Sequence, residues 1–128
     1  MKNREALKER ILREPMPNRF GELAAALARF ATVSAKYPER PDIVVQLLNE
    51  PLCYAECLTT DSTAPLQAEL SEMYSRLIEW ERDWQQINAN EIQRRTVIKQ
   101  VREWSEQMLD ASGLVEERLR EVDRKSVG

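Results

Sequence analysis

The second half of the chain contains an unbroken run of apolar residues at alternating spacings of four and three positions, which constrains the fold more than any other feature. The run consists of Leu66, Leu70, Met73, Leu77, Trp80, Trp84 and Ile87. Such spacing places these side chains along one face of an α-helix. Comparable stripes occur at Phe20, Leu23, Leu27, Phe30 and Tyr37, and at Val97, Val101, Trp104, Met108 and Ala111. Three long helices therefore each carry an apolar face that needs a partner.

Composition agrees with an all-α fold. The chain has 128 residues, of which 42% are hydrophobic and 32% charged, with only 3 glycines. This length suits one domain, and scarce glycine is typical of a helical protein rather than a sandwich or barrel. We therefore expect residues 1–128 to form a single helical domain, a bundle of four to five helices.

Prolines, glycine and cap residues predict where the helices begin and end. Pro15 and Pro17 should stop a short amphipathic helix within an N-terminal arm, residues 1–17, and Asn18 can cap the next helix, which runs to about residue 36. Pro51 predicts either a kink or a second short helix before residue 58. Gly113 is a C-cap candidate, and residues 114–128 should form a weakly ordered tail.

The long stripe raises the question of whether residues 66–112 form one rod or two helices. Extending the heptad frame beyond Ile87 would place the charged Glu91 and Arg94 on the apolar seam. We therefore favour a break at residues 88–90, with Asn88 and Glu91 as a capping box. The helices at about 66–87 and 91–112 would then form an antiparallel hairpin. We expect acidic side chains to meet basic ones across it: Glu79, Glu81 and Asp83 opposite Arg94, Arg95 and Lys99.

The residue types argue against most catalytic designs. The chain has no histidine, and Gly21 and Gly113 are too far apart for a glycine-rich phosphate loop. Cys53 and Cys57 lie four residues apart, which is typical of two small buried hydrophobes. The alternative is a metal site completed by a second subunit. We predict a non-enzyme without catalytic residues, metal or cofactor.

The aromatic residues allow two interpretations. As members of predicted seams, the tryptophans can simply pack in the core. Aromatic residues also anchor protein interfaces, so part of a seam can be a partner surface. Under this hypothesis the candidate interface residues are Tyr74, Trp80, Trp84 and Trp104.

A basic strip supports an alternative function as a nucleic-acid-associated regulator. Together with the basic N-terminal arm, this strip comprises Arg94, Arg95, Lys99 and Arg102. The net charge of -3 and the pI of about 5.2 have the wrong sign for a dedicated phosphate-binding domain. We therefore expect these side chains to belong to a salt-bridged surface, and we do not expect a nucleic-acid partner.

These observations together predict a cytoplasmic protein without membrane attachment. Charges within the first ten residues leave no signal-peptide core, and no apolar run is long enough to cross a bilayer. Because the three apolar stripes can exceed what one core of this size covers, we expect a helical interaction or adaptor module that self-associates as a homodimer or binds another protein. An enzyme or small-ligand carrier, the third class considered, has no positive feature in the sequence.

Several segments carry a resemblance to a known group of proteins. They are residues 18–29, Trp80 with Trp84, and the stretch from Trp104 through Glu106 to Ser112, Gly113 and Leu114. Across most of residues 3–114 the chain resembles small uncharacterised helical proteins of cyanobacterial type. The resemblance implies a bacterial cytoplasmic setting, and it implies no activity and no site residue.

Overall fold

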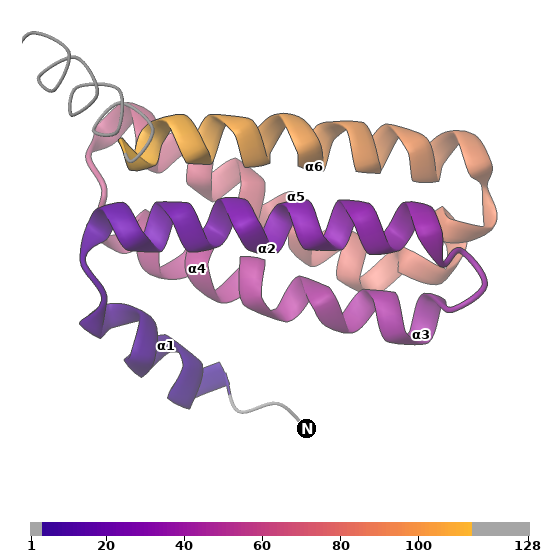
Figure 1. Cartoon of the computed structure of the whole chain (residues 1–128), viewed down its shortest axis with the longest axis horizontal. Helices are drawn as coiled ribbons and strands as arrows, with labels where there is room; N and C mark the ends of the chain where they lie inside the picture. Colours follow the sequence, from indigo (N-terminus) through magenta and orange to yellow (C-terminus); the bar gives the residue numbers. More distant parts are fainter. Residues whose placement is uncertain (1–3, 114–128) are drawn as a thin grey trace, which may run out of the picture.

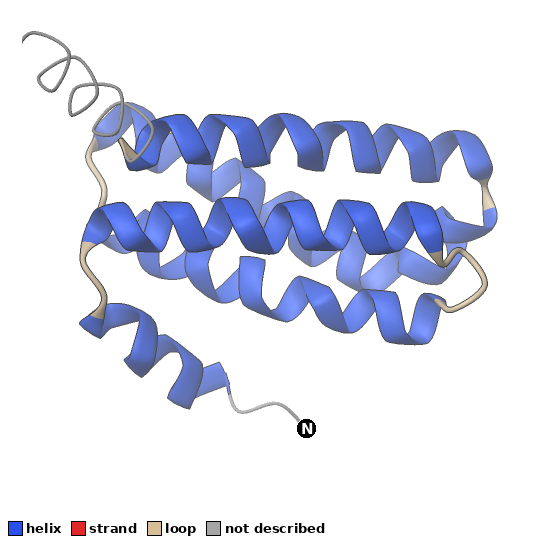
Figure 2. Ribbon diagram, viewed as in Figure 1, coloured by secondary structure: helices blue, strands red, loops and turns tan. Residues whose placement is uncertain are grey.

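The computed structural model describes residues 4–113, which are helical over nearly their whole length and contain no strand (Figures 1 and 2). The predicted all-α bundle is thereby confirmed. The predicted tail, 114–128, lies outside the described residues. In chain order the elements are α1 (Arg4–Arg13), α2 (Met16–Lys36), α3 (Pro41–Val44), the 3₁₀-helix η1 (Val45–Leu48), α4 (Asn49–Asp61), α5 (Ala64–Ala89) and α6 (Glu91–Ser112).

Prolines set several helix starts. Pro17 and Pro51 both lie in the first turn of a helix, α2 and α4 respectively, where a missing backbone N–H removes no intrahelical hydrogen bond. The predicted cap at Asn18 is wrong, because α2 already begins at Met16. Residues 41–61 form one helical run in which η1 separates α3 from α4.

The predicted break between the two longest helices is confirmed, but its cap differs from the prediction. Asn90 separates α5 from α6, and its side-chain oxygen accepts a hydrogen bond from the backbone N–H of Gln93 at 3.1 Å. Asn88 is instead buried and donates to the carbonyl of Pro38 at 2.7 Å. At the other end of α6, Gly113 adopts the left-handed φ of 72°, as expected for a C-cap.

Helices α5 and α6 are consecutive, yet each packs more closely on another helix. Figure 1 shows α6 lying along α2, while α4 and α5 form the other side of the bundle. The buried alanines of α2 allow this close approach, and the hydroxyl of Ser105 on α6 donates to the carbonyl of Ala24 at 2.7 Å. The most extensive helix contacts in the bundle are therefore those of α2 with α6 and of α4 with α5, whereas α5 and α6 pack loosely against each other.

The predicted ion pairs across the α5–α6 hairpin are wrong. Glu81 pairs with Arg4 of α1 at 2.7 Å, and Asp83 pairs with its neighbour Arg82 at 2.9 Å. Arg95 binds Glu91 within α6, also at 2.7 Å. These acidic side chains and Arg95 therefore take partners on their own helix or on α1 rather than across the hairpin.

The core lies between α2, α4, α5 and α6 and includes most of the predicted apolar stripes. At its centre the rings of Phe30 and Trp84 meet edge to face, with centroids 5.1 Å apart. Trp84 is only 1% exposed, and its indole N–H has no hydrogen-bond partner among the described residues. Among the stripe residues, Tyr37 and Ala111 at the ends are exposed, and Trp80 is half-buried.

A buried guanidinium fixes the end of α1. Arg19, which is 8% exposed, donates to the carbonyls of Leu12 and Glu14 at 2.8 Å each and binds the carboxylate of Asp61 at 2.7 Å. The last carbonyls of a helix have no partner within it, so Arg19 supplies the donors that they need. We call this arrangement the Arg19 clasp, because it joins the ends of α1 and α4 through the start of α2.

Tyr54 of α4 makes the stability of the fold sensitive to alkaline pH. It is 2% exposed, and its hydroxyl donates to the Glu14 carboxylate at 3.4 Å. Burial, helped by the charge of Glu14, raises the pKa of Tyr54 from 10.0 to about 12. The phenol therefore ionises first in the unfolded chain, and its contribution to stability is complete below about pH 10 and is lost as the pH rises toward about 12.

We expect the chain to lose about 2 kcal/mol more of its unfolding free energy than a Tyr54→Phe variant when the pH rises from about 9 to about 12. Phenylalanine keeps the ring but cannot ionise, so the difference isolates this phenol. Urea titrations of both proteins at each pH measure the effect. Parallel pH profiles would show that Tyr54 does not titrate as described.

Candidate functional site

The loose packing of α5 against α6 leaves a groove between them that is open to solvent. Trp80 of α5 and Trp104 of α6 stack across this space, with ring centroids 5.2 Å apart and an interplanar angle of 28°. A cavity lies on either side of the stacked pair along the helices. We call the two cavities and the tryptophan pair between them the α5–α6 groove.

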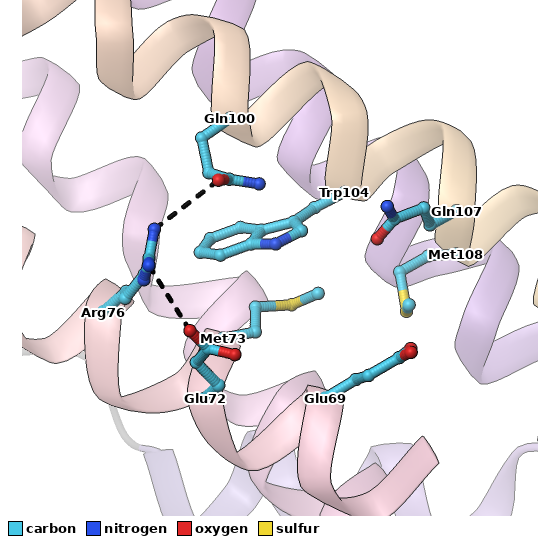
Figure 3. A pocket seen from close by; sticks show the side chains of 8 residues that line it. All are labelled: Glu69, Glu72, Met73, Arg76, Gln100, Trp104, Gln107 and Met108. Carbon is cyan, nitrogen blue, oxygen red and sulfur yellow. Dashed lines mark hydrogen bonds and ion pairs between the residues drawn. The ribbon is translucent and has the colours of Figure 1, made fainter. Parts of the chain in front are cut away.

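The first cavity, of about 270 Å³, lies toward the start of α5 and the end of α6. Figure 3 shows Met73 and Trp104 pointing toward each other across it, while Arg76 reaches from α5 to Gln100 of α6. The guanidinium lies 3.5 Å from the Gln100 amide oxygen and 3.3 Å from the Glu72 carboxylate. Methionine adapts its shape to different partners, so the floor of this cavity can accept more than one apolar side chain. Its lining is completed by Glu69, Gln107 and Met108.

The second cavity, of about 450 Å³, lies near the connection between the two helices. Its apolar lining comes from Trp80 and Ile87 of α5 and from Ile92 and Val97 of α6. Ile92 is 78% exposed, the largest exposure among the large apolar side chains that the structure describes. The exposed Ile92 lies beside the half-buried Trp80, so this end of the groove presents an apolar surface to solvent. The polar lining comprises Glu79, Asp83, Gln86, Gln93 and Thr96.

The two walls of the groove differ in charge. The α5 wall carries four carboxylates and one guanidinium, whereas the α6 wall carries amides and a hydroxyl. The hydrogen bond from Arg82 holds the pKa of Asp83 below its usual range, so this carboxylate is ionised at neutral pH. Glu69 and Glu79 are exposed and make no ion pair within the described residues. The groove therefore has one acidic wall and one neutral, hydrogen-bonding wall.

The structure brings together two of the four aromatic residues predicted as a partner interface. Trp80 and Trp104 form the centre of the groove, as described above. Tyr74 is half-buried against the core and lines neither cavity. Trp84 requires a correction, because it is enclosed in the core and offers no surface to a partner. The four carboxylates of the acidic wall, Glu69, Glu72, Glu79 and Asp83, recur at intervals of three, seven and four positions, a helical spacing that indicates one solvated face in the sequence. What sequence reasoning missed is that this face lies beside α6 and forms one wall of a groove.

The predicted basic strip is divided in the structure. Arg94 turns away and donates to the carbonyl of Asn88 at 2.7 Å, which satisfies the end of α5. Arg95, Lys99 and Arg102 line a shallow cavity between α2 and α6. Glu103 and Glu106 line the same cavity, so this surface carries acidic as well as basic groups.

The remaining candidates for chemistry are the two cysteines. Cys53 and Cys57 are free and buried, and burial raises the pKa of both thiols, which disfavours the reactive thiolate. Charged residues of α1, Lys8 among them, lie close to both. Residues 4–113 contain no group of three or more side chains arranged to hold a metal ion. None of the described helices is long and apolar enough to cross a membrane.

Comparison of the chain with protein-family models, with curated proteins and with solved structures gave no match in any of the three.

Proposed function

We propose that the protein is a non-enzymatic interaction module that binds a helical segment of a protein in the α5–α6 groove. The stacked pair of Trp80 and Trp104 between two open cavities is the observation that carries this proposal. Tryptophan and methionine are favoured where proteins bind one another, and a groove between two helices is a common acceptor for an amphipathic helix. From Glu69 to Ile87 the groove follows α5 for about 27 Å, the length of a helix of about five turns.

Site-specific photo-crosslinking in a lysate of the source organism tests this proposal. A photoreactive amino acid replaces Thr96, which lines the groove. A control protein carries it at Ala25, on the exposed surface of α2. We expect a protein adduct from the Thr96 position that survives nuclease and is absent from the Ala25 position. Equal labelling at the two positions, or no protein adduct at Thr96, would contradict binding in the groove.

The nuclease treatment also separates this proposal from the nucleic-acid alternative. A regulator that used Arg95, Lys99 and Arg102 would be labelled from Lys99 rather than from Thr96, and its adducts would disappear with nuclease. Its binding would also weaken steeply as salt is added. Glu103 and Glu106 line the same cavity as these basic residues and reduce its attraction for phosphates, which is the reason for preferring the groove.

Self-association of the chain is a separate prediction, which does not depend on the binding of another protein in the groove. The apolar stripes that motivated it are mostly covered within the bundle, so the exposed large side chains would have to support it. Light scattering over a range of concentrations decides between a mass of 14.9 kDa and a multiple of it. The exposed large apolar side chains in the described residues are Leu12, Tyr37, Ile43, Ile92 and Leu109.

A further inference from the structure

We infer that the occupant of the α5–α6 groove is a basic amphipathic helix from another protein. This inference rests on the proposed function and adds the charge and the residue pattern of the partner. Its first support is the acidic wall, where four carboxylates of α5 lie beside the groove. Asp83 is paired with Arg82, and Glu72 with Arg76, which leaves Glu69 and Glu79 without an ion pair among the described residues. Arg76 is itself already engaged by Glu72 and Gln100.

The distribution of charge over α6 strengthens the argument. Its groove side carries neutral groups such as Gln93 and Thr96, while Arg95, Lys99 and Arg102 line the separate cavity toward α2. A basic helix is therefore attracted more strongly to the α5 wall than to that other surface, where three cations lie beside Glu103 and Glu106. Complementary potentials of this kind select the partner and its orientation more than they add affinity.

The same charges argue against a second copy of this groove as the occupant. In a symmetric pair, the acidic wall of one copy would lie near that of the other, and like charges so placed oppose association. Lysine or arginine side chains along the α5 edge of a foreign helix would instead meet Glu69 and Glu79, both of which make no ion pair among the described residues.

The spacing of the groove residues predicts the apolar pattern of the partner. Met73, Trp80 and Ile87 lie at successive intervals of seven residues on α5, in the first cavity, at the tryptophan pair and in the second cavity. Met73 and Ile87 are thus about 21 Å apart along the helix. A partner helix that runs along the groove would place large apolar side chains two heptads apart, with a small residue midway, above the stacked indoles.

Two synthetic helical peptides test the inference against the purified protein. Both have leucines two heptads apart and an alanine midway, and they differ only in carrying lysines or glutamates beside this stripe. We expect the lysine peptide to bind at least about tenfold more tightly than the glutamate peptide at low salt, measured by calorimetry. Added salt should reduce this preference.

Matched charge reversals locate the binding site. A Glu69→Lys, Glu79→Lys variant should lose the preference for the lysine peptide. A Glu103→Lys, Glu106→Lys variant has the same change in net charge on the surface toward α2 and should keep it. All four positions are exposed, and thermal unfolding checks that both variants fold.

Three results would overturn the inference. One is equal binding of the two peptides, which would show that charge does not select the partner. This result would not affect the proposed function. A second is a preference that survives reversal at Glu69 and Glu79. The third is no binding of either peptide, after which crosslinking at Thr96 still decides the proposed function separately.

Discussion

Replacing Trp84 by alanine is expected to lower the free energy of unfolding by about 3–5 kcal/mol, the largest effect of any single substitution proposed for this chain. The side chain is almost fully enclosed and meets Phe30 edge to face, so alanine leaves a cavity in the middle of the bundle. Urea unfolding followed by far-ultraviolet circular dichroism measures the loss. Trp84→Phe should cost much less, about 1–2 kcal/mol, because it keeps a ring and removes an indole N–H that has no partner.

Trp80→Ala is the matched control, because this tryptophan lies four residues away on the same helix and is only half-buried. We expect it to cost less than about 2 kcal/mol in stability but to weaken binding of the lysine peptide. A folded Trp84→Phe protein should bind that peptide normally. If Trp84→Phe impaired binding as much as Trp80→Ala, the assignment of one tryptophan to the core and the other to the groove would be wrong.

Replacing Arg19 by methionine is expected to cost about 3 kcal/mol, although the residue is charged and lies near the surface. Methionine keeps much of the volume but leaves the carbonyls of Leu12 and Glu14 without donors and Asp61 without its cation. Arg19→Lys should recover only part of the loss, because an ammonium on a flexible stem cannot reproduce the guanidinium fork. Urea unfolding measures all three proteins.

Arg29→Ala serves as the control for Arg19, because Arg29 makes an exposed ion pair with Glu50 at 3.4 Å. Its loss should cost less than about 0.5 kcal/mol. A second measurement shows whether α1 detaches when the Arg19 clasp is removed. The buried Cys53 and Cys57 should then react faster with a thiol reagent under native conditions, because local opening of α1 exposes them. Unchanged thiol reactivity in a destabilised Arg19→Met protein would show that the clasp does not hold α1 in place.

Local signals in the sequence predict the helix ends well. Pro51 and Gly113 act through the hydrogen-bonding needs of their own turn, so each can be interpreted without knowing the rest of the fold. The error at Asn88 arises because a second candidate cap, Asn90, lies two residues away, whereas the error at Asn18 arises because α2 begins directly after Pro15 without a side-chain cap. Which one a helix uses depends on tertiary contacts, such as the hydrogen bond from Asn88 to Pro38.

The sequence does not predict which helices pack together, and the position of the candidate site depends on that packing. Trp80 and Trp84 belong to one apolar stripe, yet only the pairing of α5 with α4 decides that Trp84 faces the core and Trp80 the groove. The burial of Arg19 could not be predicted from the sequence for the same reason, because its partners Leu12, Glu14 and Asp61 lie on three different segments. Residue type and spacing did place Trp80 and Trp104 on two apolar stripes, and the structure brings their rings together between α5 and α6.

The stacked indoles of Trp80 and Trp104 also give the protein an optical signal of its own. Two aromatic chromophores held this close at a fixed angle couple their electronic transitions, which produces a paired positive and negative band in the circular dichroism spectrum. A side chain that enters either cavity and pushes the rings apart would change that band without any added label. Occupancy of the groove can therefore be followed in the unmodified chain, and the loss of the band in Trp80→Phe would identify its source.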